Sequence, residues 1–347
     1  MKTKRIIVTG GAGFVGSVCT EVLLDAGNDV IVLDSLENGK REAVLPGAKF
    51  VLLDLCDRVA LCDLFHEEKV DAVMHFAALA DVTTSVQNPH RFFSNNVTGS
   101  LNLLEAMLES GVKNLIFSSS AAVYGEPQSV PIDEDHQKCP VNSYGESKLA
   151  TERMFAWYAK AYQFRCVSLR YFNAAGATSK LGEDRSPESH LIPSLLDVAL
   201  GKRPEIAIYG TNYPTQDGTC LRDYVHVRDI ISAHVLCLQH IEELGLEAFN
   251  VGHGVGYTVQ QVLQETKHVT GRSIEARLAP MRPGDPAALV ASPQKLASRL
   301  GWKPQHSSLR NIIEDAWAWR MTHPAGYGQG TSGVLPKIPV VAQSRGR

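Results

Sequence analysis

The chain has 347 residues, of which 44% are hydrophobic and 20% are charged, and its formal net charge is −3. This composition is typical of a globular protein with one large core or two modest domains, and the near-neutral charge gives no reason to expect nucleic acid or an anionic membrane as a partner. No apolar run approaches the roughly 20 residues of a membrane span, and the run at residues 6–8 is too short for a signal peptide.

The seven cysteines are scattered along the chain, and none forms a Cys-x-x-Cys pair. This pattern argues against a disulfide framework or a zinc site and favours reduced thiols in a cytoplasm. The histidines also lack ligand spacing, so we expect no metal.

The first elements in the chain predict a dinucleotide-binding unit. An apolar strand at residues 5–9 is followed by a turn that contains Gly10, Gly13 and Gly16, then by a helix and a second strand that ends at Asp34. The glycines let the backbone approach a pyrophosphate, the start of the helix stabilises its charge, and the acid can bind a ribose hydroxyl. Asp34 favours NAD over NADP, because it would repel a 2′-phosphate. A glycine turn with a purely structural role is the alternative.

Strands and helices continue to alternate as far as residue 170. Strands are predicted at residues 50–53, 72–76, 114–117 and 165–170, and helices at 59–68, 92–109 and 143–162. This pattern predicts an α/β fold with a doubly wound parallel sheet of the Rossmann type. Ligands bind such sheets at the carboxyl ends of the strands. The residues expected at those ends are Gly10, Asp34, Asp54, Ala77 and Ser118 to Ser120.

Two details of this half need interpretation. His75 lies among apolar residues in a strand, and we interpret it as a core histidine. Asn95 and Asn96 lie inside the predicted helix at 92–109, where asparagine is unfavourable, so at least one of them should have a specific bonding partner.

Tyr144 and Lys148 are spaced to share one helix face, close to the serine run that ends with Ser120. A lysine ammonium beside a phenol favours the phenolate, so we expect Lys148 to lower the pKa of Tyr144. Such a tyrosine can take a proton from an alcohol, which the Ser120 hydroxyl can hold. A half-buried tyrosine and a solvated lysine are the alternative interpretation, but the strand-end residues around them favour a catalytic pair.

The second half of the chain is less regular. We predict a loop at 176–187, helices at 190–200, 227–240 and 259–270, strands at 206–209 and 249–251, and a final helix that carries Trp317 and Trp319. The predicted domains are 1–172 with a return at about 221–250, then 173–220 and 251–323 as a smaller α/β substrate-binding domain, and a disordered tail at 324–347. By position alone, Arg222, Arg282 and Asp285 would be surface charges.

From about residue 4 to 327, the chain resembles the extended short-chain dehydrogenase/reductase family and, within it, the UDP-glucose (UDP-galactose) 4-epimerase subgroup. The stretch Tyr209 to Tyr224 is similar to a nucleotide-sugar loop that is particular to the subgroup. The motifs that carry the wider resemblance are residues 8–17, 75–78, 95–97, 117–125, 144–148 and 169–173.

The resemblance implies NAD as cofactor, a UDP-sugar substrate and a homodimer built by the helices after Pro89 and Ser143. It implies that Ser120 and Tyr144 are catalytic and that Lys148 supports Tyr144 and binds the nicotinamide ribose. The implied cofactor-binding residues are Gly10, Gly13, Phe14, Val15, Gly16, Asp34, Asn38, Asp54, Leu55, Phe76, Ala77, Ala78, Asn95, Asn96, Ser118, Tyr144, Lys148, Tyr171 and Phe172. The implied substrate-binding residues are Ser120, Tyr144, Phe172, Asn173, His190, Leu191, Ala207, Tyr209, Arg222, Val259, Arg282, Asp285 and Leu289.

The implied reaction is reversible 4-epimerisation of UDP-galactose and UDP-glucose through a 4-keto sugar, with transient hydride transfer to bound NAD⁺. The chain departs from some relatives at Ala80, Thr84 and His190, which concerns how tightly the cofactor and sugar are held. Leu289 matches the position that sorts plain from N-acetylated sugars, so a 4-epimerase of an N-acetylhexosamine or a pentose is the alternative.

Two more distant alternatives fit the residues less well. A 4,6-dehydratase on the same scaffold needs an Asp-Glu pair in the serine region, where this chain has Ala121 and Ala122. A non-catalytic NAD-sensing protein would have little reason to keep Ser120, Tyr144 and Lys148 together.

Overall fold

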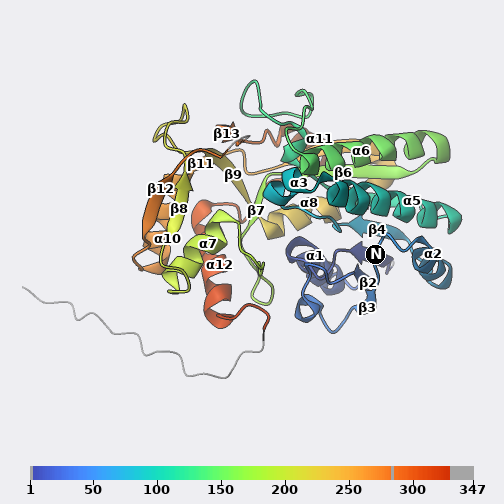
Figure 1. Cartoon of the computed structure of the whole chain (residues 1–347). Helices are drawn as coiled ribbons and strands as arrows, with labels where there is room; N and C mark the ends of the chain where they lie inside the picture. The colour runs from blue at the N-terminus through green and yellow to red at the C-terminus, as the bar shows by residue number, and fades with distance from the viewer. Residues whose placement is uncertain (1–2, 283–284, 329–347) are drawn as a thin grey trace, which may run out of the picture.

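The computed structural model describes residues 3–282 and 285–328 and contains a larger and a smaller αβ unit (Figure 1). Seven parallel strands form the larger sheet, in the order β10-β6-β5-β4-β1-β2-β3. The predicted doubly wound sheet is therefore confirmed. Its strands are β1 (Arg5–Thr9), β2 (Asp29–Asp34), β3 (Lys49–Leu52), β4 (Ala72–His75), β5 (Asn114–Ser120), β6 (Arg165–Tyr171) and β10 (Leu246–Val251).

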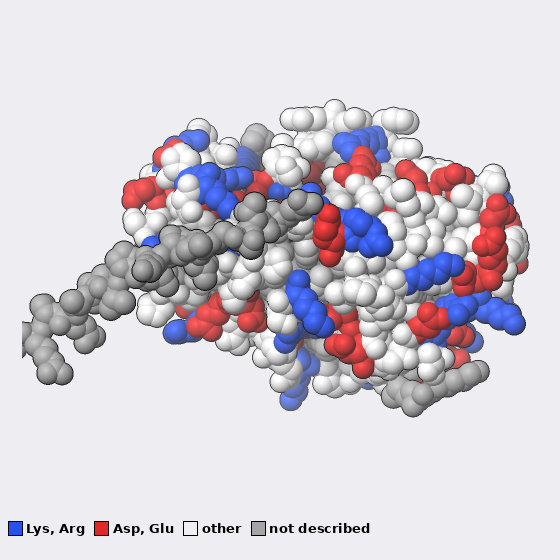
Figure 2. All heavy atoms as spheres, turned by 90° about the horizontal axis from the view of Figure 1, so that it is seen from below, with Lys and Arg blue, Asp and Glu red and all other residues white. Residues whose placement is uncertain are grey.

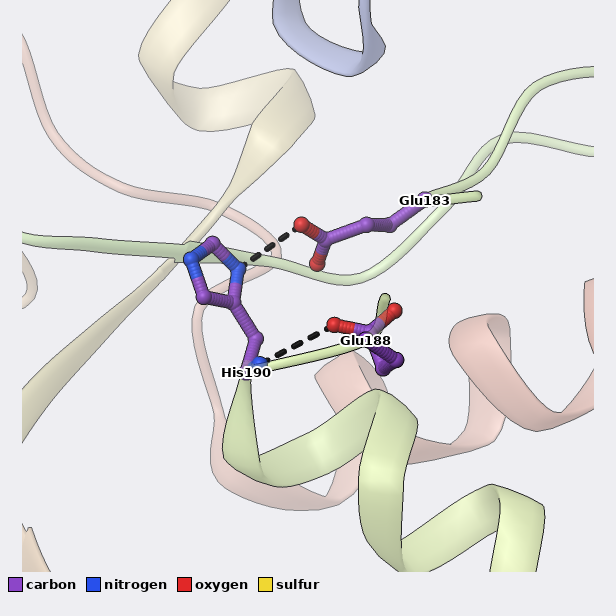
Figure 3. A group of neighbouring side chains, drawn as sticks. All are labelled: Glu183, Glu188 and His190. Atoms are coloured by element: carbon purple, nitrogen blue, oxygen red, sulfur yellow. Dashed lines mark hydrogen bonds and ion pairs between the residues drawn. The ribbon is translucent and has the colours of Figure 1, made fainter. Parts of the chain in front are cut away.

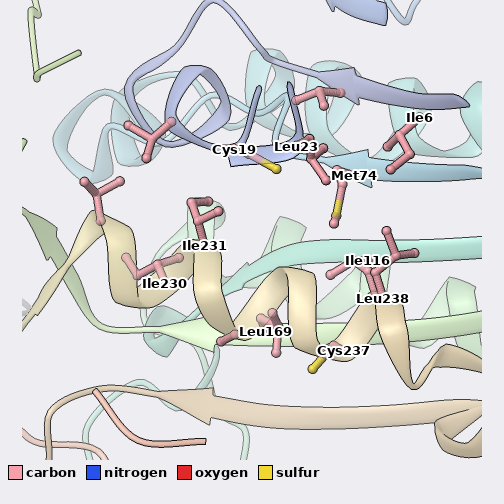
Figure 4. Packing of buried hydrophobic residues seen from close by; sticks show 14 of the residues in the cluster. Ile6, Cys19, Leu23, Met74, Ile116, Leu169, Ile230, Ile231, Cys237 and Leu238 are labelled. Atoms are coloured by element: carbon pink, nitrogen blue, oxygen red, sulfur yellow. The ribbon is translucent and has the colours of Figure 1, made fainter. Parts of the chain in front are cut away.

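Helices cover both faces of this sheet, which explains why its strands are almost continuously apolar. On one face lie α1 (Phe14–Asp25) and α8 (Val227–Gln239), and on the other lie α2 (Arg58–Glu67), α5 (Gly99–Glu109) and α6 (Ser143–Tyr162). Successive strand residues point to opposite faces, so Ile6 and Val8 pack in the α1/α8 core while Ile7 packs in the other. Figure 4 shows α1 and α8 side chains meeting the strand side chains in the first of these cores.

The smaller unit has its own core. β9 (Leu221–His226) pairs with β7 (Asn173–Ala175), β11 (Gly256–Thr258) and β13 (Ala288–Leu289), and β8 (Ile206–Tyr209) pairs with β12 (Ala276–Ala279). The helices α7 (Leu191–Ala199), α10 (Val259–Thr270) and α12 (Leu309–Thr322) pack together in this core. β9 lies in this sheet, although we predicted a return to the larger unit from residue 221; the return begins with α8.

Short helical elements lie between the longer helices and the strands. These are α3 (Val82–Gln87), α4 (Pro89–Phe92), α9 (Ile241–Leu244), α11 (Gln294–Leu300) and the single turns at Arg41–Ala43 and Ala121–Val123. The predicted helix at 92–109 is not uniform, because a π-helical turn, Phe93–Thr98, separates α4 from α5. Such turns are frequent at functional sites, and this one carries both asparagines that the sequence marked as unusual.

The prediction that a disordered tail starts at residue 324 is wrong, because residues up to Tyr327 pack against the rest of the protein. Tyr327 packs on Trp319 with ring centroids 5.2 Å apart, and its hydroxyl accepts a hydrogen bond from the Gly182 amide at 3.0 Å. The Tyr327 amide also donates to Asp184 Oδ2 at 2.9 Å. These contacts fix the end of α12 against the 176–187 loop. Residues 329–347 lie outside the described part of the chain.

Within residues 3–282 and 285–328, no helix combines the length and apolar character required to cross a membrane. On the face shown in Figure 2, positive and negative side chains are interspersed over most of the surface, as the small net charge leads one to expect.

Candidate active site

The turn after β1 is shaped by close backbone contacts. Gly10 has φ +70°, and a Cβ placed on it would lie 2.6 Å from the amide nitrogen of Ala77 at the end of β4. A Cβ on Gly16 would lie 2.2 Å from the Gly10 carbonyl oxygen. Only glycine lets β1, β4 and α1 approach this closely. A Cβ on Gly13 would meet the Gly10 carbonyl oxygen at 3.3 Å and nothing else among the described atoms within 4 Å, so Gly13 borders open space.

The first turn of α1 is suited to an anion. Gly13 is its N-cap, and no side chain within the described ranges caps it. The amides of the predicted residues Phe14, Val15 and Gly16 therefore lie at a helix start where backbone donors and the helix dipole favour negative charge. A glycine-lined turn that leads into such a helix start fits the pyrophosphate of a dinucleotide.

Asp34 ends β2 beside this turn and is buried. Its Oδ2 accepts a hydrogen bond from the Ala12 amide at 3.0 Å, and its Oδ1 accepts one from the Leu36 amide at 2.8 Å. Burial raises the pKa of Asp34, and these two bonds oppose the rise. Each carboxylate oxygen keeps acceptor capacity for a ribose hydroxyl. The residues at this strand end therefore fit NAD.

Asn96 connects the segment after β4 to α6, the helix that carries Tyr144 and Lys148. Its Oδ1 accepts from the Leu79 amide at 2.8 Å, and its Nδ2 donates to the Leu79 carbonyl at 3.0 Å and to Ser147 Oγ at 2.8 Å. This confirms that at least one of the two asparagines has specific partners. Asn96 thereby fixes the segment after β4 against α6.

His75 is a buried core residue, as predicted. Its Nδ1 lies 2.7 Å from Thr9 Oγ1, and its Nε2 lies 2.8 Å from Ser100 Oγ. Burial, and secondarily the charge of Lys148, lowers its pKa to about 3. The imidazole is therefore neutral near pH 7 and links β1, β4 and α5.

Ser120, Tyr144 and Lys148 meet at the carboxyl end of β5. The helix that carries the last two begins at Ser143, as predicted, and the Asn142 side chain caps it by accepting from the Gly145 amide at 2.9 Å. Lys148 Nζ donates to the Ser118 carbonyl at 2.8 Å and lies 4.8 Å from the centroid of the Phe117 ring. Tyr144 is buried, and the Ser120 hydroxyl interacts with its phenol.

The expectation that Lys148 lowers the pKa of Tyr144 is wrong. Burial raises the pKa of Tyr144, and the groups that oppose the rise are the Ser120 hydroxyl and the Arg185 guanidinium. Lys148 is itself buried, which lowers its pKa to about 7. An ammonium that is only partly protonated near pH 7 provides less positive charge than the spacing of the two residues implied.

On the substrate side, the 176–187 loop and the start of α7 carry a cluster of charged side chains (Figure 3). Glu183 is buried, and its Oε1 pairs with Arg185 Nε at 2.8 Å and with His190 Nδ1 at 2.7 Å. Burial alone would raise the pKa of Glu183, but these two cations outweigh it and lower the pKa to about 2. Glu183 in turn raises the pKa of His190. Glu188 completes the cluster by accepting from the His190 amide at 2.9 Å.

The remaining charged residues of the substrate side form pairs. Arg222 on β9 is buried, and its Nη2 pairs with Asp285 Oδ1. The Arg282 guanidinium lies 3.8 Å from the centroid of the Tyr209 ring. The expectation from position alone, that Arg222 is a surface charge, is therefore wrong: β9 carries its side chain inward, beside Asp285.

Other residues named from the sequence lie at element ends or in the loops between elements. Phe172 and Leu289 pack in one small apolar cluster with Tyr124 and Ala291. Asp54 Oδ1 accepts from the Cys56 amide at 2.8 Å. The positions are β7 for Asn173, the start of α7 for Leu191, β8 for Ala207, the start of α10 for Val259, the end of β6 for Tyr171, the loop after β2 for Asn38, the segment after β3 for Leu55, the segment after β4 for Phe76 and Ala78, and the π-helical turn for Asn95.

Three charged residues of the cluster around His190 were not predicted, namely Glu183, Arg185 and Glu188. Glu183 and Arg185 lie in a Gly- and Pro-containing stretch that carries no helix or strand period. The available signal was the run of charges from Glu183 to Arg185, but nothing in it indicated that the loop folds back towards Tyr144.

Comparisons with known proteins agree with this geometry. Residues 6–252 match the model of the NAD dependent epimerase/dehydratase family. The UDP-glucose 4-epimerase of Halalkalibacterium halodurans is 48% identical over 93% of this chain and 97% of that relative. A crystal structure of a UDP-glucose 4-epimerase has a TM-score of 0.91 at 46% identity and covers 94% of this chain and 100% of its own. That of Bifidobacterium longum, in complex with NAD⁺ and UDP, has a TM-score of 0.89 at 36% identity, with coverage of 93% and 99%.

Proposed function

The chain belongs to the NAD dependent epimerase/dehydratase family, and from that premise we infer that it interconverts UDP-galactose and UDP-glucose by inverting C4 of the sugar. The observation that carries this inference is the position of Ser120, Tyr144 and Lys148. They lie at the carboxyl end of β5, in the same sheet edge as the glycine turn and Asp34. A proton acceptor for a sugar hydroxyl is thus combined with a dinucleotide cradle.

NAD fits the residues of this cradle. The turn from Gly10 to Gly16 and the start of α1 would hold the pyrophosphate, and Asp34 would hold the adenosine ribose. We assign Lys148 to the nicotinamide ribose, since Nζ already points at the end of β5. When bound, NAD⁺ accepts a hydride from C4 of the sugar and returns it to either face.

Tyr144 moves the proton. Its phenolate takes the proton of the 4-hydroxyl as C4 is oxidised and gives it back when C4 is reduced. Ser120, whose hydroxyl interacts with the phenol, orients the same sugar oxygen. Burial raises the pKa of Tyr144, and the Ser120 hydroxyl and the Arg185 guanidinium oppose this rise. We assign Lys148, when it is protonated, to the same role, because a cation near a phenol favours the phenolate.

The substrate side must hold the nucleotide while the sugar turns over. We assign Arg222 and Arg282 to the diphosphate, because planar guanidinium groups match phosphate oxygens. Arg222 is paired with Asp285, and Arg282 lies over Tyr209. These contacts fix the positions of both cations. Binding energy from the nucleotide can then position a sugar that stays free to rotate.

Sugar choice rests on Leu289. This residue is half-buried on β13 against the cluster that contains Phe172. A leucine side chain narrows the pocket more than serine or cysteine would, so we propose that plain hexoses are preferred to N-acetylated ones. An equal or higher kcat/KM on UDP-N-acetylglucosamine would contradict this preference.

We also propose a homodimer formed by α5 and α6. Large apolar side chains are exposed on this part of the surface, among them Leu101 on α5 and Trp157, 68% exposed, and Tyr162 on α6. The two helices lie side by side (Figure 1). Exposed apolar side chains on neighbouring helices are a feature of protein interfaces. Trp157→Glu should convert a dimer to a monomer in light scattering; a wild-type protein that is monomeric would contradict the proposal.

A cytoplasmic location is consistent with the cysteines. All seven are free thiols, and Cys19, Cys166 and Cys237 are buried. Burial raises the pKa of each of these three thiols, to about 12 for Cys166 and Cys237, which keeps them protonated and unreactive. Cell fractionation with a tagged full-length chain tests the location.

The experiment that tests the function is a conversion assay on the purified protein. UDP-galactose is supplied with and without added NAD⁺, and UDP-glucose is quantified by chromatography. Conversion in either condition supports a 4-epimerase, and conversion without added NAD⁺ means that the cofactor is retained on purification. If the protein does not convert UDP-galactose but does convert a UDP-N-acetylhexosamine or a UDP-pentose, then that sugar nucleotide is the substrate and UDP-galactose is not.

A further inference from the structure

A buried ion pair lies one helical turn beyond Lys148. Tyr144, Lys148 and Glu152 follow one another at four-residue spacing on α6, so their side chains share one helix face. Glu152 pairs with Arg170 of β6 through two hydrogen bonds, Nε to Oε1 at 2.9 Å and Nη2 to Oε2 at 2.6 Å. Their side chains are 9% and 5% exposed. None of the functional assignments made above uses this pair.

Further hydrogen bonds extend the pair across the sheet. Ser119 Oγ donates to Glu152 Oε1, and Arg170 Nη1 donates to the Tyr124 hydroxyl at 3.0 Å. The Tyr124 hydroxyl donates to Asn250 Oδ1 on β10 at 2.7 Å. Side chains alternate along a strand, so Ser119 faces away from Ser118 and Ser120. The network therefore fixes α6 to β5, β6 and β10 without occupying the catalytic face.

The same carboxylate acts on Lys148 through space. Burial lowers the pKa of Lys148 to about 7, and the Glu152 carboxylate is the charge that opposes this shift. His75 of β4 also faces Lys148, but its pKa of about 3 leaves it neutral above pH 5. Tyr144 is the other titratable group of α6 on this face. Arg170, which faces Glu152 from β6, remains charged throughout the accessible pH range.

One more titratable group lies near the pair. Lys138, in the segment between Val123 and α6, has a pKa that burial lowers and that the Glu152 carboxylate raises. Its Nζ donates to the Glu134 carbonyl at 2.8 Å. Burial thus lowers the pKa of both lysines and Glu152 acts on both, so the experiment has to separate Lys138 from Lys148.

We propose that Glu152, held in place by Arg170, is a positioning residue for the reaction: it fixes α6 against the end of β5 and supplies the countercharge of Lys148. The proposal rests on the proposed function, in which a protonated Lys148 supports Tyr144. A buried ion pair often stabilises a protein no more than well-packed apolar residues would. The proposal therefore gives the Glu152–Arg170 pair a role in the reaction in addition to its role in packing.

The test uses Glu152→Gln in the full-length holoenzyme. Glutamine keeps the shape and one acceptor but removes the charge, so Lys148 should lose its proton at lower pH. We expect the alkaline limb of the kcat–pH profile to move down by about one pH unit, as the loss of one nearby charge does, with little change in KM. A profile that superimposes on the wild type would overturn the proposal.

Three further variants control this result. Glu152→Gln with Arg170→Gln removes both charges and leaves no unpaired buried cation; the same downward shift is expected from it. Tyr124→Phe disrupts the network but keeps the Glu152 charge, so its stability should fall while its profile keeps the wild-type limb. Lys138→Gln should also keep that limb; a shift in this variant would assign the limb to Lys138 and contradict the proposal.

A second readout does not require turnover. The ¹³Cε chemical shift of Lys148, assigned as the signal lost in Lys148→Met, is followed against pH in wild type and Glu152→Gln. We expect the midpoint of this pH titration to be lower in Glu152→Gln than in the wild type. An unchanged midpoint would show that Glu152 is not the countercharge of Lys148. If the wild type fails to convert any UDP-sugar, the proposed function fails, whereas this titration still decides the role of Glu152.

Discussion

The two sides of the active site are held by different interactions. On the cofactor side, strand ends are fixed by backbone approach and by neutral hydrogen bonds, as at Gly10 and Asn96. On the substrate side, loops are joined by ion pairs, as at Glu183 and Arg222. Close backbone contacts make the first set of strand ends rigid, whereas ion pairs can exchange partners when a charged ligand binds. Each prediction below tests one side against the other.

Tyr144 stands between the two sides and should have the largest effect. Tyr144→Phe removes the group that takes the proton, and a general base contributes about 10²- to 10⁴-fold to kcat. We expect kcat on UDP-galactose to fall by that amount, while the affinities for NAD⁺ and UDP, measured by calorimetry, stay as in the wild type. True turnover at the wild-type rate would mean that another residue is the base.

Arg222 tests the substrate side alone. Arg222→Leu removes a charge-assisted hydrogen-bond donor, which is worth about 1.5–3 kcal/mol, or roughly 10- to 100-fold in the UDP dissociation constant. NAD⁺ affinity should not change. The matched control is Arg277→Leu on β12, whose exposed pair with Glu205 should contribute little. If Arg222→Leu weakens NAD⁺ binding as much as UDP binding, then Arg222 does not act on the substrate side alone.

The buried charge of Lys148 should lower the free energy of unfolding, so replacing this residue should stabilise the protein. Its pKa is lowered from 10.5 to about 7 on folding, so a buried charge destabilises the protein fully below pH 7 and the penalty disappears as pH rises towards 10. We expect apo Lys148→Met to gain about 1–3 kcal/mol at pH 6–7, after the lost hydrogen bond is deducted, and to lose this advantage by pH 10. Denaturant titrations at several pH values measure it. A gain that is independent of pH would contradict this explanation.

Asp34 is the counterpart of Arg222 on the cofactor side. Asp34→Ala removes the acceptor for ribose hydroxyls, and we expect about tenfold weaker NAD⁺ binding, since a net hydrogen bond to a charged group is worth about 1.5 kcal/mol or more. UDP affinity should be unaffected. The same variant should narrow the preference for NAD⁺ over NADP⁺, because it no longer repels a 2′-phosphate. If the NAD⁺ affinity of Asp34→Ala is unchanged, then a residue other than Asp34 binds the ribose.

Tyr327 should have the smallest effect. Tyr327→Phe removes the hydroxyl that bonds to Gly182, beside Glu183, at a cost of about 1 kcal/mol. We expect a few-fold rise in KM for the UDP-sugar with NAD⁺ affinity unchanged. Tyr162→Phe, on the exposed end of α6, is the control. An effect on NAD⁺ binding as large as that on KM would show that the C-terminal contact is not confined to the substrate side.

The sequence predicted the cofactor side well, because that side depends on local order. The glycine turn, Asp34 and the helix from Ser143 to Tyr162 follow from spacing, and parallel strands bring their ends to one edge. The π-helical turn was missed, since its cause is the bonding of Asn96 to Leu79 and Ser147, which no local period encodes. The direction of the Tyr144 pKa shift was missed because spacing does not reveal how deeply a side chain is buried.

The substrate side was less predictable for a physical reason. Arg222 and Asp285 are 63 positions apart, and neither lies in a pattern that indicates the other. The cluster around Glu183 forms in a loop without periodicity, and Tyr327 reaches it from a segment whose composition predicts disorder. The expectation that Arg222 and Asp285 bind the nucleotide came from resemblance to a known family rather than from the residues themselves.

The central claim is that one buried site removes a hydride from C4 and returns it to the same carbon while the cofactor stays in place. Its most direct test is to supply UDP-galactose deuterated at C4 and to analyse the product by mass spectrometry and NMR. We expect UDP-glucose that retains the deuterium at C4, with no transfer of deuterium to unlabelled substrate mixed into the same reaction. Loss of the deuterium to solvent would mean that C4 is inverted by proton abstraction, and it would contradict the account.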